Sequence, residues 1–259
     1  MEKFNYKKKY GQNFLIDNNI LTKIADSFNT SPNDLIIEIG PGSGALTRKL
    51  KNKGSHLICF EIDKETKPYL DKLKDEKTEF IYEDILSVDL KKIIDKVKYD
   101  NLFIVGNLPY YITTKIITTI INLELNPKEM VFMVQKEVAD RFMAKPKTRD
   151  YGYITVLLNY FYDMERVVFA PKECFKPMPK VDSEVVKFTK NIKKGVENCK
   201  DFNSFLKECF RFKRKKLLNN ITNYNKRIIE QYLIDNNLSL NTRAEELSVE
   251  SYIDLYKKI

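Results

Sequence analysis

Short apolar runs alternate with amphipathic stretches through the first part of the chain. The runs are rich in β-branched and aromatic residues, and the stretches between them carry apolar residues at helical spacing. This alternation predicts an α/β fold with a parallel sheet and helices on both of its faces. The predicted strands are LIIEI (35–39), HLICFEID (56–63), TEFIYEDIL (78–86), NLFIVGNLPY (101–110), EMVFMVQ (129–135) and SEVVKFTK (183–190). The predicted helices are residues 17–28, 64–74, 112–123, 136–145 and a segment directly after the glycines at 40–44.

The pattern changes near the end of the chain. From Asp201 onward every pattern is helical, with basic residues between the apolar ones. In the first part of the chain, Asp17 is a candidate N-cap for the first predicted helix. Residues 191–200 read as a linker. We therefore expect two domains, an α/β domain over residues 1–194 and a small all-helical domain over residues 195–259.

Charge and cysteine content narrow the function classes. The net charge of +9, from 45 basic and 36 acidic residues, favours a polyanionic partner such as nucleic acid, although a Lys-rich composition bias gives the same surplus. The single histidine, His56, and the absence of a C-x-x-C pair argue against a metal site and a disulfide framework. We expect a reducing, cytoplasmic location. The chain contains no apolar run of about 18 residues, so we expect no membrane-spanning helix.

A glycine-rich loop, EIGPGSG (38–44), joins a predicted strand to a predicted helix. Glycines there let a ligand approach the backbone closely, and the ligand can be a dinucleotide or another adenosine cofactor. The match to G-x-G-x-x-G is imperfect, because the third glycine, Gly44, comes one residue early, and no ATP P-loop pattern occurs.

Two acidic residues end the next two predicted strands. Glu61 can accept hydrogen bonds from both ribose hydroxyls, and Asp84 can accept from an adenine amino group. Either acid alone can equally be a helix cap or a turn residue. Together with Glu38, they suit a cationic adenosine ligand such as S-adenosylmethionine better than a pyrophosphate, which they would repel.

The stretch NLPYYITT (107–114) follows the fourth predicted strand, at the edge where open α/β sheets bind ligands. The Asn107 side-chain oxygen and the Leu108 carbonyl can accept the two hydrogens of an adenine amino group. Pro109 stiffens the turn, and Tyr110 can stack on a base removed from its helix. The expected chemistry is an in-line methyl transfer that depends on orientation and needs no metal. An ordinary β–turn–α connection is the alternative.

Six segments in this order identify a family. They are GQNFL (11–15), EIGPGSGALT (38–47), FEID (60–63), EDIL (83–86), NLPYYITT (107–114) and FKPMPKVDSEVV (175–186). The chain closely resembles the ribosomal RNA adenine dimethyltransferases over nearly its whole length. Leu108 favours the small-subunit type, whose loss confers kasugamycin resistance, over the macrolide-resistance type that modifies large-subunit rRNA and usually reads N-I-P-Y.

The resemblance implies roles for individual residues and a substrate. Asn13 and Leu15 would contact S-adenosylmethionine, Gly40 and Gly42 would line its methionine end, and Phe175 would form a second face of the base stack. The implied reaction is N6,N6-dimethylation of two adjacent adenosines near the 3′ end of small-subunit rRNA within an immature subunit, by a monomeric enzyme. Tyr111 departs from the Asn that family members often carry there.

Basic residues are the expected phosphate contacts. They are Lys7, Lys8, Lys9, Arg211, Lys213, Arg214, Lys215 and Lys216. The second group can alternatively be a solvated helix face. Three alternatives to the small-subunit enzyme remain open: the large-subunit rRNA methyltransferase, a non-catalytic factor in ribosome assembly or transcription, and a DNA adenine methyltransferase.

Overall fold

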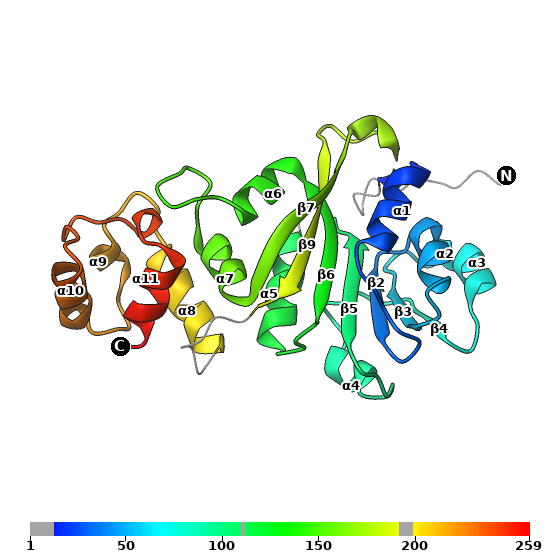
Figure 1. Ribbon diagram of the computed structural model, residues 1–259, viewed down its shortest axis with the longest axis horizontal. Helices are drawn as coiled ribbons and strands as arrows, with labels where there is room; N and C mark the ends of the chain where they lie inside the picture. The colour runs from blue at the N-terminus through cyan, green and yellow to red at the C-terminus, as the bar shows by residue number, and fades with distance from the viewer. Residues whose placement is uncertain (1–12, 110–111, 192–198) are drawn as a thin grey trace. The chain divides into compact units, whose positions relative to one another are not determined.

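The computed structural model describes residues 13–109, 112–191 and 199–259, and the chain divides into two compact units (Figure 1). The first takes its described residues from Met1–Ala139 and Met164–Lys190, and the second from Asp140–Asp163 and Asn191–Ile259. None of the helices in these described ranges is long and apolar enough to cross a bilayer.

The first unit is built on a seven-stranded sheet of order β4-β3-β2-β5-β6-β9-β7. All six predicted strands are present, but three are shorter than predicted: β3 ends at Phe60, β4 at Ile81 and β5 at Asn107. The strands are β2 (Leu35–Ile39), β3 (His56–Phe60), β4 (Thr78–Ile81), β5 (Leu102–Asn107), β6 (Glu129–Gln135), β7 (Tyr162–Ala170) and β9 (Ser183–Lys190). A separate two-stranded ribbon pairs β1 (Phe14–Leu15) with β8 (Phe175–Lys176).

The sheet is mixed, which corrects the expectation of a purely parallel one. Strands β2 to β6 pair in parallel, whereas β9 runs antiparallel to β6, with Ser183 opposite Gln135. The nine-residue strand β7 was not predicted. Most residues of β7 are exposed or half-buried. Its sequence therefore alternates charged and apolar residues over only part of its length, which is a weak strand signal.

Helices surround the central strands (Figure 1). Strands β2 and β5 are buried along nearly their whole length, as their continuous apolar runs require. The prediction that Asp17 caps the first helix is confirmed, because its carboxylate accepts hydrogen bonds from the N–H groups of Asn19 and Ile20, each at 2.9 Å. The helices are α1 (Asn18–Asp26), α2 (Ala45–Lys51), α3 (Lys67–Leu70), α4 (Leu90–Ile94), α5 (Thr113–Asn122) and α6 (Lys136–Phe142).

The second unit is helical around an aromatic core. Phe202, Phe205 and Tyr252 are fully buried, and the ring centroids of Phe205 and Tyr252 lie 6.4 Å apart. The Tyr252 hydroxyl donates to the Ala244 carbonyl at 2.7 Å, so the buried polar group is satisfied. The helices are α7 (Tyr153–Phe161), α8 (Cys199–Cys209), α9 (Leu217–Asn220), α10 (Lys226–Asp235), the 3₁₀ turn η5 (Ala244–Glu246) and α11 (Val249–Tyr256).

The compact units do not divide at residue 194. Helix α7, which was not predicted, packs on α8 with the ring centroids of Tyr160 and Phe202 5.1 Å apart. The contacts therefore group Asp140–Asp163 with the C-terminal helices. The functional division into residues 1–194 and 195–259 stays a prediction.

Candidate functional site

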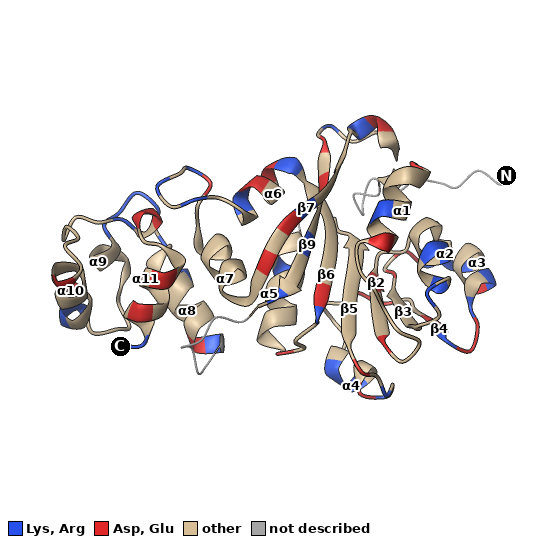
Figure 2. Ribbon diagram, viewed as in Figure 1, with Lys and Arg blue, Asp and Glu red and all other residues tan. Residues whose placement is uncertain are grey.

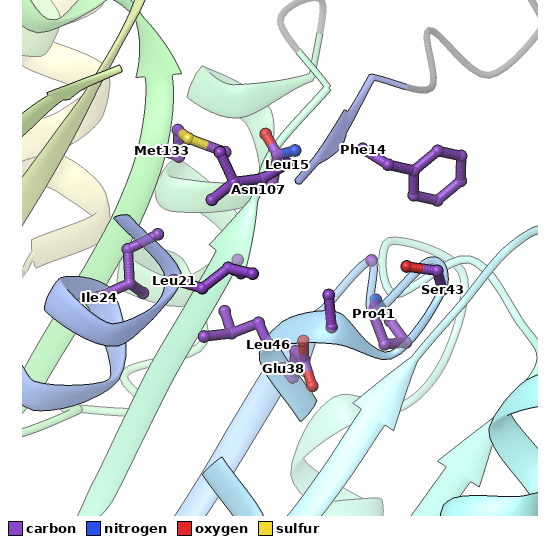
Figure 3. A pocket seen from close by; sticks show the side chains of 13 residues that line it. Phe14, Leu15, Leu21, Ile24, Glu38, Pro41, Ser43, Leu46, Asn107 and Met133 are labelled. Atoms are coloured by element: carbon purple, nitrogen blue, oxygen red, sulfur yellow. The ribbon is translucent and has the colours of Figure 1, made fainter. Parts of the chain in front are cut away.

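The candidate site lies at the carboxyl ends of β2 and β5. These strands are neighbours in the sheet although they are not consecutive along the chain, so the order of connection reverses between them. Such a switch point is where open α/β sheets bind ligands. A pocket of about 440 Å³, including the part open to solvent, occupies this place (Figure 3). Its lining residues are Phe14, Leu15, Leu21, Ile24, Glu38, Gly40, Pro41, Ser43, Ala45, Leu46, Gly106, Asn107 and Met133.

The glycine loop after β2 has the conformation that its sequence predicts. Gly40, Gly42 and Gly44 have φ of 71°, 55° and 76°, in the left-handed region that favours glycine. A Cβ atom on Gly42 would lie 2.3 Å from Cε1 of Phe14. The aromatic ring of the N-terminal ribbon therefore lies directly against the loop, a contact that only glycine permits.

Glu61 is buried, with 5% of its surface exposed, and its carboxylate holds the glycine loop in place. Oε2 accepts from the N–H of Gly42 and Oε1 from the N–H of Asp63, both at 2.9 Å. Burial raises the pKa of Glu61, and these backbone hydrogen bonds oppose the rise. A carboxylate has about four acceptor positions, so Glu61 can bind the loop and still accept from a ligand hydroxyl.

Glu38 lines the pocket and is 1% exposed. Burial, reinforced by the nearby charge of Glu61, raises the pKa of Glu38 to about 7, against opposing hydrogen bonds. The Cys59 thiol donates toward Glu38 Oε2 at 3.5 Å. The sequence interpretation used Glu38 only as a charge that disfavours a pyrophosphate and did not name it among the residues that bind the cofactor. Its signal was an ionisable residue inside the apolar run LIIEI.

Asn107 ends β5, and its amide is held from the N-terminal ribbon. Nδ2 donates to the backbone carbonyl of Asn13 at 2.9 Å, which leaves Oδ1 as the acceptor end of the side chain. The preceding Gly106 allows close packing, because a Cβ atom there would lie 2.6 Å from the Ile39 carbonyl oxygen. The structure thus brings together Asn13, Gly40 and Asn107, with the Gly40 Cβ position 3.8 Å from the Asn107 carbonyl oxygen.

The turn after Asn107 is fixed by backbone hydrogen bonds. Leu108 is 1% exposed and its N–H donates to the Met133 carbonyl at 3.2 Å. The Pro109 carbonyl accepts from the Ile112 N–H at 3.1 Å and from the Thr113 hydroxyl at 3.2 Å. The Pro109 carbonyl is therefore hydrogen-bonded to the first residue of α5 and to the residue before it. Tyr110 and Tyr111 lie outside the described residues.

The remaining predicted site residues are not gathered in one place. Leu15 lines the pocket and lies opposite Phe175 in the ribbon, but Phe175 is 3% exposed and belongs to the buried core. Asp84 caps a turn by accepting from the Leu86 N–H at 2.9 Å, and nothing in the described chain joins it to the pocket. The five basic residues between Arg211 and Lys216 are exposed, and Lys7, Lys8 and Lys9 lie outside the described residues.

These residues fit S-adenosylmethionine on two structural counts. Two buried acids, Glu38 and Glu61, stand beside the glycine loop, and burial raises the pKa of both. A positively charged ligand would stabilise their ionised forms, whereas a pyrophosphate would oppose them. Gly40 carries no side chain, so at this point of the pocket wall a ligand can approach the loop backbone closely, between the lining side chains of Pro41 and Ser43. No group of three or more potential metal ligands is found within the described ranges.

Comparison with known sequences gives a consistent result. The family model described as ribosomal RNA adenine dimethylase matches residues 3–259. The ribosomal RNA small subunit methyltransferase A of Bacillus licheniformis is 37% identical, over 99% of this chain and 92% of its own length. The protein of the same name from Geobacillus kaustophilus is 39% identical, over 97% of this chain and 90% of its own length.

Solved structures share the fold. A dimethyladenosine transferase from Plasmodium falciparum superposes with a TM-score of 0.79 at 24% identity, covering 93% of this chain and 95% of that one. The 23S rRNA methyltransferase ErmE superposes with a TM-score of 0.69 at 25% identity, covering 95% and 99%. The expected Rossmann-like methyltransferase fold is confirmed. From the full-length family match and the close relatives, the chain belongs to the ribosomal RNA adenine dimethylase family of S-adenosylmethionine-dependent methyltransferases.

Proposed function

We propose that this enzyme transfers methyl groups to the N6 atoms of two adjacent adenosines near the 3′ end of small-subunit rRNA, two to each. The observation that carries the proposal is the fixed amide of Asn107, whose Nδ2 is bonded to the Asn13 carbonyl at the carboxyl edge of the sheet. The names of the relatives support the small subunit as the source of the substrate.

The protein's part in the reaction is to orient a weak nucleophile. The adenine N6 lone pair is delocalised into the ring, and hydrogen bonds that hold the amino group in a pyramidal geometry make it available. In the first transfer to a base, Asn107 Oδ1 accepts one N6 hydrogen and the Leu108 carbonyl accepts the other. In the second transfer a single N6 hydrogen remains, and one of the two acceptors holds it. The buried Leu108 side chain and the Pro109 carbonyl, with its two donors, keep this carbonyl from rotating. S-adenosylmethionine, when bound, would supply the electrophilic methyl group, with its thioether as the leaving group and one proton lost from N6 for each methyl gained.

The cofactor is assigned to the glycine loop and its acids. Gly40 and Gly42 would face its methionine end, Glu61 would accept from its ribose hydroxyls, and Asp84 would accept from its adenine amino group. Asn13 and Leu15 would complete the contact from the ribbon. Glu61 would do two things at once, because the same carboxylate holds the Gly42 N–H.

Tyr110 is assigned to stack on the target base, with Phe175 as the second face. Because Phe175 is buried opposite Leu15, its role requires the ring to turn toward the pocket when RNA binds. A Phe175→Leu variant tests this. A raised KM for RNA with unchanged cofactor affinity supports the stack, and an unchanged KM removes Phe175 from the assignment.

The substrate is proposed to be an immature small subunit, bound by a monomer in the cytoplasm. Exposed basic residues from Arg211 to Lys216 supply phosphate contacts. Neutralising all five would weaken binding to the particle and flatten the salt dependence of the affinity. An unchanged slope would defeat this assignment.

The experiment that tests the function is methyl transfer to small subunits from cells that lack the corresponding gene. We expect four methyl groups per particle and a primer-extension stop at the two adenosines, since dimethylated adenosine blocks reverse transcription. Parallel assays use large-subunit rRNA and duplex DNA. Transfer to either substrate in preference to the small subunit would favour the large-subunit or the DNA enzyme, and absence of cofactor binding in titration calorimetry would favour a non-catalytic factor.

A further inference from the structure

The loop between α6 and α7 carries three cations that the sequence patterns did not single out. Residues 143–150 read MAKPKTRD, and Lys145, Lys147 and Arg149 occupy alternate positions in it. All three side chains are exposed. The loop belongs to the same compact unit as the C-terminal helices, although most of those helices lie 50 or more residues further along the chain.

Two hydrogen bonds fix the loop to η5 and to the residue that follows it in the same unit. The Lys147 N–H donates to the Glu245 carbonyl at 2.7 Å, and Lys147 itself adopts φ of 67°. Just after the loop, the buried Tyr151 hydroxyl donates to the Leu247 carbonyl at 2.9 Å. The backbone that carries the three cations is therefore held in one arrangement on the helical unit, so little backbone entropy remains to be lost when a ligand binds them.

A second cationic segment lies against this loop. Lys213 Nζ donates to the Arg149 carbonyl, and Lys216 forms an isolated β-bridge with Arg243, close to the Glu245 that holds Lys147. Figure 2 shows basic residues on both segments of this unit. We call the whole set the cationic surface. Its members are Lys145, Lys147, Arg149, Arg211, Lys213, Arg214, Lys215 and Lys216.

Neighbouring acids do little to neutralise the cationic surface. Across the described part of the chain, none of its eight side chains forms an ion pair. Glu208, the acid nearest to Arg211 in sequence, turns its carboxylate to Thr222 and Asn223, whose side chains donate to it at 2.8 and 3.0 Å. These exposed cations suit phosphate groups, which give affinity without reading sequence. The exposed Phe212 ring, with the Arg211 guanidinium 5.1 Å from its centroid, lies in the same segment.

We propose that loop 143–150 is a second contact with the RNA backbone and that it forms, with residues 211–216, one continuous binding surface for the phosphates of the substrate. This inference rests on the proposed function, because it takes the polyanion to be the rRNA that is methylated. The sequence alone led us to expect an RNA contact at residues 211–216. The inference adds loop 143–150, which lies before α7, β7 and β9 in the chain.

The test neutralises the loop and measures the salt dependence of binding. The triple variant K145Q/K147Q/R149Q would bind undimethylated small subunits with a smaller slope of log K against log salt. The decrease would be roughly two to three, because each neutralised phosphate contributes about one to the slope. The KM for the particle would rise by the same factor as the dissociation constant, and kcat at saturating particle would not change.

Two matched variants make the result specific. K91Q/K92Q/K96Q removes the same charge from positions in and just after α4, and its slope would stay at the parent value. K145R/K147R/R149K keeps the charges of the loop and would keep the slope. Since the substituted side chains lie on the surface, all three variants would unfold at nearly the parent temperature.

The possible failures are distinguishable. An unchanged slope in K145Q/K147Q/R149Q, or an equal drop in the α4 control, overturns the inference while methyl transfer by the parent enzyme still supports the proposed function. Weakened binding to the intact particle but not to its purified rRNA would assign the loop to a ribosomal protein and would also overturn it. A parent enzyme that methylates no small subunit refutes the proposed function itself.

Discussion

The edge of the sheet and the cationic surface are both rich in charge, but they hold it in opposite ways. At the edge, Glu38 and Glu61 are buried. The Glu61 carboxylate accepts a hydrogen bond from the backbone of Gly42, and the Asn107 amide donates one to the backbone of Asn13. On the cationic surface, eight basic side chains are exposed to solvent. Chemistry needs groups held in one geometry, whereas phosphate binding needs many charges that act nearly independently.

This difference predicts how each region responds to substitution. A change at the edge removes a group with fixed partners and leaves those partners buried, so single substitutions there have large effects. A change on the cationic surface removes one of several screened charges, so single substitutions there have small effects that add. Substitutions in both regions test this contrast, and we take them from the largest expected effect to the smallest.

The largest effect is expected at Asn107. Asn107→Ala removes the proposed acceptor for the adenine amino group, together with the Nδ2 donor to the Asn13 carbonyl. We expect kcat to fall by roughly 10²- to 10³-fold, as when one preorganised hydrogen-bonding group is removed from an active site. Single-turnover methyl transfer with saturating cofactor and particle measures the loss.

Asn107→Asp separates orientation from acceptance. The carboxylate keeps an acceptor but cannot donate to Asn13, and it should recover little activity if the orientation of the amide matters. Cofactor affinity in both variants, measured by calorimetry, is the control. A loss of cofactor binding that accounts for the whole loss of rate would contradict a role for Asn107 in holding the base.

The next effect is a dependence of stability on pH that comes from Glu38. Its pKa rises from 4.5 to about 7 in the folded protein, so the folded state keeps a proton that the unfolded state releases between these values. Stability from this source is therefore lost as pH rises through that window, by about 3 kcal/mol in total. Glu38→Gln cannot ionise and should remove this component.

The measurement is urea unfolding of both proteins at several pH values between about 4.5 and 8, a range that spans the ordinary and the raised pKa of Glu38. The stability difference between Glu38→Gln and the parent should move in favour of the variant as pH rises. The slope is the readout, because a buried amide has its own hydrogen-bonding cost that shifts all values together. Parallel curves would show that Glu38 ionises at its ordinary pKa.

Much of the edge could be predicted because its signals are local. Continuous apolar runs predict β2 and β5, and the glycines that follow β2 adopt the positive φ that their spacing suggests. Glu61 and Asn107 lie at strand ends, and parallel strands bring their carboxyl ends to one edge. These inferences need no knowledge of which distant residues touch.

The contacts that complete the edge could not be predicted from local pattern. Asn13 and Asn107 are 94 residues apart, and Phe14 reaches Gly42 only because β1 pairs with β8. Two-residue strands carry no periodic signal. The exposed strand β7 and loop 143–150 were likewise missed, the first because its burial does not alternate cleanly and the second because three spaced cations resemble ordinary solvated surface.

A smaller effect tests how closely β2 and β5 are packed. In Gly106→Ala the new Cβ atom would meet the Ile39 backbone oxygen at 2.6 Å, and a strand backbone cannot move aside without disturbing the sheet. We expect a loss of about 1–3 kcal/mol in the free energy of unfolding, together with weaker cofactor binding because Asn107 moves with its neighbour.

Gly152→Ala is the matched control. Gly152 has φ of −162°, and no atom lies within 4 Å of its Cβ position. Its substitution should leave the free energy of unfolding equal or slightly higher, by up to about 1 kcal/mol, through a less flexible unfolded chain. Equal losses in both variants would mean that glycine flexibility, and not the contact with Ile39, sets the cost at Gly106.

The smallest effect is expected for a single cation. Lys215→Gln should reduce the salt slope of particle binding by about 0.7 to 0.9, the value for one phosphate contact, with a loss of affinity of a few-fold and no change in kcat. Lys91→Gln on α4 is its control. If Lys215→Gln instead lowered kcat as Asn107→Ala does, the cationic surface would contain an orienting group with fixed partners, and the contrast between the two regions would fail. If the losses from successive neutralisations add in log K, each cation contributes separately, as an exposed surface of screened charges requires.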